Sequence, residues 1–167
     1  MIAVGDRLPD AKFRVKPEDG PIVEIPAAEL FAGQRVVLVG VPGAFTATCH
    51  NAHVPQFVEN AAGLKARGAD RIVAISVNDA YVMRAWQQSL GATGKLDFVA
   101  DGDGDYGRAL GLLVPILGMG MRLKRFSALV EDGVVKALNF EPQGAKGISS
   151  TGAAMMLAQL HAGSPAG

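Results

Sequence analysis

Residues 36–53 constrain the fold of this chain more than any other stretch of its sequence. They begin with an almost continuous, valine-rich apolar run, which indicates a buried strand over residues 35–41. Pro42 and Gly43 then interrupt the pattern, and a segment compatible with a helix follows from about Thr48. This order predicts a buried strand whose carboxyl end leads through a tight turn into a helix N-terminus.

Cys49, the only cysteine of the chain, lies where this helix begins. Thr46 and Thr48 are both plausible caps, because a threonine side chain can accept a hydrogen bond from an N–H group of the first turn. Open N–H groups and the positive end of the helix dipole stabilise a thiolate. The position of Cys49 therefore predicts a reactive cysteine rather than an inert buried one.

The length and the cysteine count limit the architecture. A chain of 167 residues, with 49% apolar and 19% charged residues, has room for one well-buried core. We expect a single domain over residues 1–163, followed by a flexible tail over 164–167. One cysteine excludes a disulfide within the chain and a metal site of four cysteines.

The composition argues against several classes of partner. Lys plus Arg and Asp plus Glu number 16 each, and no basic run is long, so nucleic-acid binding is not expected. No segment approaches the roughly 18 apolar residues of a membrane span. Residues 1–6 lack the basic and then apolar pattern of a secretory signal. We therefore expect a cytoplasmic protein that binds neither membranes nor nucleic acid.

The order of the elements predicts an α/β protein with a thioredoxin-like fold. An N-terminal hairpin extension precedes three strands that alternate with helices, and a second hairpin and a last helix follow. The central sheet should be mixed and flanked by helices, with Cys49 at the carboxyl edge of its parallel strands. The expected strands are 11–15, 22–25, 35–41, 72–77, 96–100, 125–130 and 134–140, and the expected helices are 27–31, 48–66, 80–90, 106–110 and about 150–160.

Two segments fit no regular element. Residues 110–121 are apolar but contain glycines and Pro115, so we expect an ordered loop with an apolar surface. Asp101, Asp103 and Asp105 alternate with glycine as in a calcium loop, but the closing bidentate glutamate is absent. A solvated turn is the simpler interpretation, and neither a metal nor a cofactor is expected.

Peroxiredoxins share a Pro-x-x-x-Thr-x-x-Cys signature, and residues 42–49 of this chain, Pro-Gly-Ala-Phe-Thr-Ala-Thr-Cys, resemble it. The Pro-Gly-Ala-Phe-Thr form, with His53 four residues after the cysteine, is similar to the peroxiredoxin-5 subfamily. Further blocks resemble that subfamily in the same order, so that the resemblance covers nearly the whole chain. They lie at 75–80, 86, 100–101, 122–127, 132–139 and 141–142. With one cysteine, the chain looks like a one-cysteine, bacterial-type member.

The resemblance implies a thiol-dependent peroxidase that reduces hydrogen peroxide and organic hydroperoxides. Cys49 looks like the peroxidatic cysteine, Thr46 like the hydroxyl that bonds thiolate and peroxide, and Pro42 like the ring that shields them. Arg125 looks like the active-site guanidinium of the family. The resemblance also implies a homodimer, in which residues 110–121 and Phe45 lie close to the partner subunit.

The reaction requires more than an ionised sulfur. An ordinary thiol, with a pKa of about 8.5, is only about 3% ionised at pH 7, so full ionisation gains about thirtyfold, or about 2 kcal/mol. Donors aimed at the breaking O–O bond must supply the larger share. The candidates are the Thr46 hydroxyl, the N–H groups near Thr48 and Cys49, and Arg125, whose charged fork can serve both the thiolate and the departing oxygen.

His53 lies one helical turn after Cys49, so the two share a face of a regular helix. Thiol hydrolases also pair cysteine with histidine, but they need a third, orienting group, and we therefore interpret His53 as structural or polarising. A metal cluster of Cys49, His50 and His53 is disfavoured because adjacent helical residues point apart. Trp86 is expected in the core and Arg122 on the surface.

The chain has no second cysteine to resolve an oxidised Cys49, and residues 147–150, where some relatives carry one, include serines instead. An external thiol must therefore reduce the sulfenic acid. Glutathione, glutaredoxin and thioredoxin are all candidates, with a small thiol preferred, and this chemistry fits a reducing cytoplasm. A disulfide reductase would need Cys-x-x-Cys, which is absent. A peroxide sensor or redox chaperone without efficient turnover remains an alternative.

Overall fold

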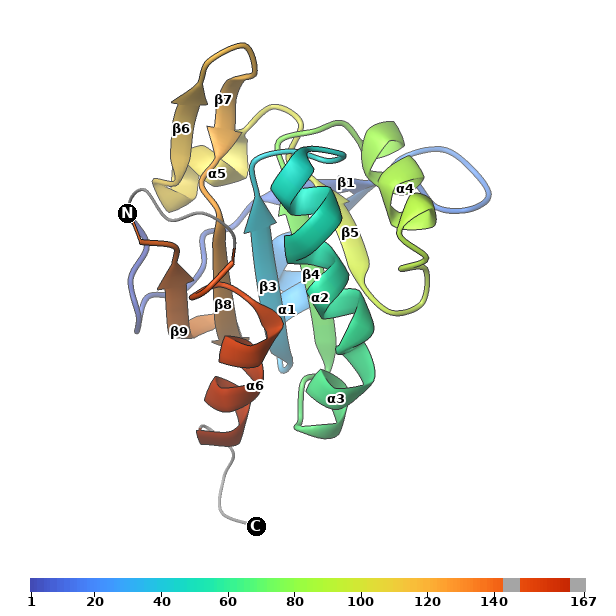
Figure 1. Cartoon of the computed structure of the whole chain (residues 1–167). Coiled ribbons are helices and arrows are strands. Elements are labelled where there is room, and N and C mark those ends of the chain that lie inside the picture. Colours follow the sequence, from blue (N-terminus) through green and yellow to red (C-terminus); the bar gives the residue numbers. More distant parts are fainter. Residues whose placement is uncertain (143–147, 163–167) are drawn as a thin grey trace.

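Figure 1 shows the computed structural model of the chain, which describes residues 1–142 and 148–162. Seven strands form one sheet in the order β2-β1-β5-β4-β3-β8-β9, and β6 and β7 form a separate two-stranded sheet. The strands are β1 (Lys12–Val15), β2 (Val23–Pro26), β3 (Arg35–Val41), β4 (Arg71–Ser76), β5 (Asp97–Ala100), β6 (Leu113–Ile116), β7 (Gly120–Leu123), β8 (Phe126–Glu131) and β9 (Val134–Phe140). The helices are α1 (Ala27–Phe31), the π-helix η1 (Cys49–His53), α2 (Val54–Glu59), α3 (Ala61–Ala66), α4 (Ala80–Ser89), α5 (Asp105–Leu110) and α6 (Ala153–Ala162).

β3 lies inside the sheet and has the bounds that the sequence predicts. It pairs in parallel with β4 and antiparallel with β8, and β4 pairs in parallel with β5. The N-terminal hairpin of β1 and β2 extends the sheet beyond β5. The predicted α/β fold class, a thioredoxin-like mixed sheet with an N-terminal hairpin extension, is confirmed.

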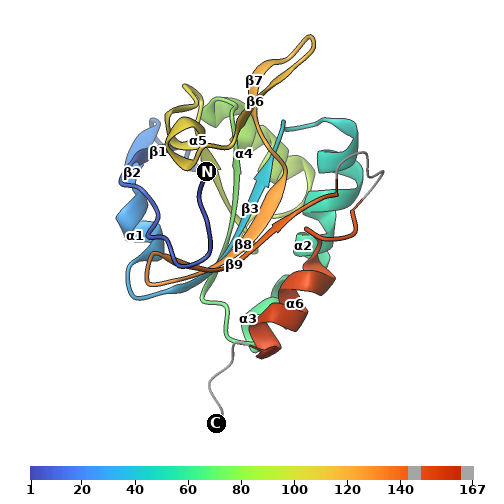
Figure 2. The same cartoon turned by 90° about the vertical axis from the view of Figure 1, so that its left-hand side faces the viewer.

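Helices cover both faces of the sheet, and each face has its own apolar core. Figure 2 shows α2, α3 and α6 on one side of the sheet and α1 and α5 on the other. Alternate residues of β3 point to opposite faces. Val37 and Val39 pack in the core that includes residues of α2 and α6, whereas Val36 and Leu38 pack in the core that includes residues of α1 and α5. Burial on both faces makes β3 a firm support for the loop that follows it.

The helix expected over 48–66 is divided into three segments. η1 is a π-helical turn, in which the Cys49 carbonyl accepts a hydrogen bond from the N–H five residues later. Pro55 follows, and because proline has no N–H it cannot donate the next α-helical hydrogen bond. Asn60 separates α2 from α3, and its side chain donates to the Gln56 carbonyl at 2.7 Å in competition with the backbone. The prediction of one regular helix is therefore wrong.

Residues 110–121 contain most of a β-hairpin, not the ordered loop that the sequence predicts. β6 and β7 pair antiparallel along their whole lengths. Pro115 is accommodated because both strands of a two-stranded sheet are edge strands. Gly118, in the turn, has a φ of 77°, which glycine adopts readily. The hairpin projects from the body of the protein in Figures 1 and 2, so no covering layer imposes an alternating pattern on its sequence.

The turn at 101–105 differs from the expected solvated turn in one residue. Asp101 is buried, and its carboxylate accepts hydrogen bonds from the N–H groups of Tyr106 at 3.0 Å and Gly107 at 2.8 Å. Burial raises the pKa of Asp101, and these two donors oppose the shift. Asp101 therefore anchors the first turn of α5. Among the described residues, no group of three or more His, Cys, Asp or Glu side chains is placed to hold a metal ion.

The last helix begins at Ala153, slightly later than the expected residue 150 or 151. The N–H groups of residues 149–151 are bound by the Glu141 carboxylate instead of forming a helical turn. The expected tail over 164–167 lies outside the described residues. In the part of the chain that the structure describes, no helix is both long and apolar enough to span a membrane.

Candidate active site

Cys49 lies close to the carboxyl end of β3, at the edge of the sheet where open α/β folds place their chemistry. Residues 42–46 connect the strand to the helix, and the His50 N–H donates the first helical hydrogen bond to the Thr46 carbonyl at 2.8 Å. Cys49 therefore lies in the first helical turn, as expected. It is a free cysteine with a fully buried side chain, so only a small reactant or a local opening brings another group to the sulfur.

Arg125 reaches Cys49 from the residue just before β8, which is distant in the sequence. β8 pairs antiparallel with β3, and Phe126 lies opposite Gly40, so the residue before β8 lies beside the end of β3. Gly40 permits this approach, because a Cβ atom there would overlap the Phe126 ring. Arg125 Nη2 donates to Cys49 Sγ at 3.1 Å. A charged hydrogen bond thus joins two residues that the local sequence does not connect.

His53 holds the other arm of this guanidinium. Arg125 Nη1 donates to His53 Nδ1 at 2.8 Å, and His53 Nε2 donates to the Thr151 carbonyl at 2.9 Å. We assign the proton to Nε2 because a carbonyl can only accept. Burial, together with the Arg125 charge, lowers the pKa of His53 to about 4. His53 is therefore neutral at pH 7, and with both ring nitrogens occupied it is not the base of a hydrolase pair.

Neither threonine caps the helix through its side chain. The Thr46 hydroxyl donates to the Gly43 carbonyl at 2.7 Å, and Thr48 makes no side-chain capping bond. The predicted threonine cap is wrong, because the hydroxyl of Thr46 closes its own turn. Thr46 and Pro42 are both half-buried in the loop that leads to Cys49. The conformation of this loop therefore determines where the Pro42 and Thr46 side chains lie relative to Cys49.

Two residues outside the predicted site hold this region in place. Asn78 Oδ1 accepts from the Ala44 N–H at 3.0 Å and from the Ser76 hydroxyl at 2.7 Å. Arg122, expected on the surface, is half-buried, and its Nη1 donates to the Val77 carbonyl at 3.0 Å. Asn78 directly follows the strand that the sequence predicts over residues 72–77, and this position is the one sequence signal that could have indicated it. The carboxyl ends of parallel strands meet at one edge of the sheet, so a polar residue there lies near the site.

Phe45, His50 and Trp86 form an aromatic cluster beside this loop. Phe45 stacks on the His50 ring with 5.6 Å between centroids, and Trp86 Nε1 donates to His50 Nδ1 at 2.9 Å. Trp86 is fully buried, as expected of a core residue. Phe45 is 48% exposed and has a φ of 61°, which a bulky residue rarely adopts. His50 and His53 thus face different partners and do not gather with Cys49 as metal ligands.

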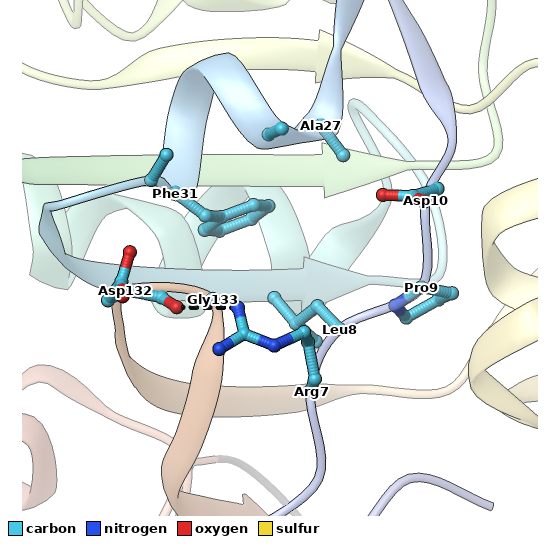
Figure 3. Close-up of a pocket in the computed structure, with 10 residues that line it drawn as sticks. Arg7, Leu8, Pro9, Asp10, Ala27, Phe31, Asp132 and Gly133 are labelled. Carbon is cyan, nitrogen blue, oxygen red and sulfur yellow. Dashed lines mark hydrogen bonds between the residues drawn. The ribbon is translucent and has the colours of Figure 1, made fainter.

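The pocket shown in Figure 3 lies at the far end of β8 from Cys49 and has a volume of about 90 Å³. Two hydrogen bonds hold Arg7 and Asp132, which line it. Arg7 Nη1 donates to the Asp132 carbonyl at 2.9 Å, and the Asp132 carboxylate accepts from the Gly33 N–H at 2.7 Å. The surrounding side chains are mostly apolar, among them Leu8 and Phe31. The lining of this pocket contains no cysteine, histidine or serine, and Cys49 lies outside it.

Comparisons with known proteins agree with this geometry. Residues 3–155 match the Redoxin family. The chain is 48% identical over 156 residues to the chloroplastic peroxiredoxin-2E-2 of Oryza sativa subsp. japonica, covering 89% of this chain and 69% of that protein. It is similar to reduced Prx3 from Vibrio vulnificus in complex with hydrogen peroxide, with a TM-score of 0.89, 42% identity, and coverage of 96% and 99%. It also resembles peroxiredoxin 5 from Alvinella pompejana, with a TM-score of 0.84, 26% identity, and coverage of 97% and 99%.

A buried cysteine at the carboxyl edge of a thioredoxin-like sheet, hydrogen-bonded to an arginine, defines a thiol-based redox protein. The chain belongs to the peroxiredoxin family, and the resemblance to peroxiredoxin-5-like members is confirmed. It is therefore a thiol-dependent peroxidase, and its single cysteine is consistent with a one-cysteine enzyme.

Proposed function

We propose that Cys49 is the residue through which this peroxidase reduces hydroperoxides. Its thiolate attacks one oxygen, an S–O bond forms as the O–O bond breaks, and the other oxygen takes up a proton and leaves as water or an alcohol. The sulfur is oxidised to a sulfenic acid and the peroxide is reduced. The observation that supports this role most directly is the hydrogen bond of 3.1 Å from Arg125 Nη2 to the sulfur.

Arg125 supplies the main electrostatic stabilisation. The neutral His53 ring accepts from one guanidinium nitrogen and adds no second charge, so the undivided positive charge of the guanidinium lies beside the sulfur. A fixed cation favours the thiolate, and the same fork can donate to the oxygen on which charge develops. A donor of this kind contributes about 3 kcal/mol, or about a hundredfold in rate.

Thr46 and Pro42 frame the space for the peroxide. Because the Thr46 hydroxyl donates its proton to Gly43, its oxygen can accept a hydrogen bond from the O–H of the hydroperoxide. The Pro42 ring shields the sulfur from water, and Thr48 contributes a backbone N–H of the first helical turn. Phe45, which is partly exposed, forms an apolar rim.

A thiol from outside the chain completes the cycle. The sulfenic acid condenses with one thiol to give a mixed disulfide and water, and a second thiol releases reduced Cys49 together with a disulfide of the reductant. The sulfur is fully buried, which favours a small thiol such as glutathione over direct approach of a folded protein. Glutaredoxin can then act on the mixed disulfide, and thioredoxin is the alternative reductant.

Turnover of hydrogen peroxide with a series of reductants tests this cycle. We expect catalytic consumption of hydrogen peroxide and of an organic hydroperoxide with glutathione, accelerated by glutaredoxin, and none in Cys49→Ser. If the wild-type protein is oxidised once and no thiol restores it, the protein is a peroxide sensor or redox chaperone instead of an efficient enzyme.

Exposed apolar side chains support a homodimer. Leu117 at the hairpin tip is completely exposed, and Met121 and Phe45 are 51% and 48% exposed. A second copy of the chain would cover such residues, in line with the resemblance to the family. We expect a dimer in sedimentation analysis and a shift toward monomers in Leu117→Lys. A wild-type protein that stays monomeric at micromolar concentration would contradict this assembly.

The dependence on a free thiol favours a reducing compartment, and we place the enzyme in the cytoplasm. Two relatives are chloroplastic, so members of the family are not confined to the cytoplasm. Fractionation of the source cells, followed by immunodetection, tests the location. Recovery of the protein in a membrane-enclosed organelle would contradict it.

A further inference from the structure

The Glu141 carboxylate, just after β9, gathers the N–H groups of three successive residues. Oε1 accepts from Ser149 at 2.7 Å, and Oε2 accepts from Ser150 at 2.9 Å and Thr151 at 2.6 Å. The Ser149 hydroxyl adds a bond to Oε1 at 2.9 Å. Burial raises the pKa of Glu141, but the Thr151 hydroxyl nearby and the donors of Ser149 and Ser150 outweigh it and lower the pKa to about 2. The carboxylate is therefore ionised and firmly bound at neutral pH.

Thr151 links this carboxylate to the active site through its backbone. Its N–H donates to Glu141, while its carbonyl accepts from His53 Nε2 at 2.9 Å. The N–H and the carbonyl belong to neighbouring peptide planes that meet at the Thr151 Cα atom, so the bond to Glu141 holds the carbonyl in place only where φ and ψ of Thr151 are also restrained. Thr151 is also fully buried, which leaves its backbone little room to move.

Gln56 confines the same segment from the side of α2. Its Oε1 accepts from the Ala153 N–H at 3.3 Å, and a Cβ atom at Gly152 would lie 2.5 Å from that oxygen. Gln56 also follows His53 by three residues, close to one turn of helix. The segment that carries the Thr151 carbonyl is thus held between the end of β9 and α2.

From Thr151 the contacts lead to the sulfur. The carbonyl keeps the proton of His53 on Nε2, which leaves Nδ1 to accept from Arg125 at 2.8 Å. If the carbonyl moves away, the proton can reside on Nδ1, and two donors then face each other. This arrangement would displace the guanidinium that donates to Cys49 Sγ.

We propose that Glu141 is a positioning residue of the peroxidase site, a role that rests on the proposed function of Cys49 and Arg125. Through the Thr151 carbonyl it fixes the tautomer of His53, and with it the place of Arg125. Among the ion pairs of the described residues none joins Glu141 to Arg125, so the contacts between them run through the backbone of Thr151 and the His53 ring. The Glu141 charge also acts directly on His53, where it partly opposes the lowering of the pKa.

Glu141→Gln tests this role because the amide keeps the shape of the carboxylate but turns an N–H group toward a backbone donor. We expect the second-order rate constant for hydrogen peroxide to fall about tenfold, since a misplacement of about 1 Å can lower a rate by about 100-fold. The ratio of Cys49 alkylation rates at pH 6.5 and pH 10, which reports the thiolate fraction, should fall several-fold. Glu131→Gln is the matched control: it removes a carboxylate that pairs with Arg35 at 3.0 Å, at the other end of β8, and should change neither value.

A double-mutant cycle separates positioning from a general loss of stability. In Arg125→Ala protein, Glu141→Gln should have no further effect, whereas independent effects would multiply. Ser149→Ala removes one donor and should give a change of about twofold in the same direction, even if Glu141→Gln does not fold. Unchanged rates and ratios in these variants, or multiplied effects in the cycle, would overturn the proposal. The alkylation ratio requires no peroxidase activity, so its outcome is distinct from a failure of the proposed function.

Discussion

The neutral state of His53 makes the stability of this protein depend on pH. The ordinary pKa of the imidazole is 6.5, and burial together with the Arg125 charge lowers the pKa to about 4 in the folded protein. Between these values the unfolded chain binds a proton that the folded protein excludes, so folding is disfavoured progressively as the pH falls. The stabilisation is complete above pH 6.5 and is lost toward pH 4.

The shift in the pKa of His53 corresponds to about 3 kcal/mol, at about 1.4 kcal/mol for each pKa unit. This is a substantial part of the roughly 5–15 kcal/mol that stabilises a typical domain. Urea unfolding at pH 7.5 and pH 4.5, followed by the fluorescence of buried Trp86, measures it. Between these pH values, we expect the free energy of unfolding to fall by about 2–3 kcal/mol more in wild type than in His53→Gln, because glutamine does not titrate.

His161→Gln controls for the loss of a histidine as such, because His161 is exposed on α6. This variant should retain the pH dependence of the wild type. Equal pH dependence in wild type and His53→Gln would refute the buried, neutral histidine. A charged His53 would carry a proton on Nδ1 as well as on Nε2, so Nδ1 could not accept from Arg125 and the explanation of how Arg125 is oriented would fail.

Three substitutions probe the site and its support. Arg125→Ala should lower the rate constant for hydrogen peroxide about 100-fold in stopped-flow measurements, because it removes the charged donor 3.1 Å from Cys49 Sγ. A rate close to that of wild type would show that the reaction does not use this contact. Thr46→Val should lower the same rate about tenfold with an unchanged circular dichroism spectrum, and an unaltered rate would place the hydroxyl outside the peroxide site. Gly40→Ala should lower the melting temperature by about 3–10 °C, because the added methyl group overlaps the Phe126 ring and overpacking costs about 1–3 kcal/mol. An unchanged melting temperature would mean that β3 and β8 can separate at no cost.

Much of the sheet follows from local sequence patterns. The apolar run of β3 is long and bounded by turn residues, so its bounds are predicted correctly. Asp79 precedes a helical pattern and caps α4 by accepting from the Val82 N–H at 2.9 Å. The turn between β8 and β9 uses Asp132 and Gly133, both with positive φ, as its sequence indicates. In each of these cases a short stretch of chain determines the local structure by itself.

The hairpin of β6 and β7 and the π-helical turn at Cys49 could not be predicted in this way. The hairpin has no covering layer, so neither face carries an alternating pattern. The π-helical turn depends on Pro55, whose missing N–H acts on the turn before it. Thr46 shows a similar limit, because a threonine hydroxyl can donate to a nearby carbonyl and close a turn instead of accepting from a helix N–H.

Within the site, local pattern locates Cys49 but not its partners. Arg125 is 76 residues away and reaches the sulfur through the pairing of β8 with β3, so only the resemblance to peroxiredoxins indicates it in the sequence. His53 contacts both Arg125 and the Thr151 carbonyl, and a structural or polarising role for it stays a prediction. Glu141 binds backbone N–H groups, which every residue except proline carries. The sequence therefore contains no pattern of side chains from which this contact could be predicted.

The rate constant of Cys49 with hydrogen peroxide at pH 7, compared with that of free glutathione under the same conditions, tests most directly whether the site activates the peroxide as well as the thiol. Complete ionisation alone gives an advantage of at most about thirtyfold. With Arg125 donating to the breaking O–O bond and Thr46 holding the O–H of the hydroperoxide as an acceptor, we expect an advantage of at least about a thousandfold. An advantage of about thirtyfold or less would contradict a site built to stabilise the transition state.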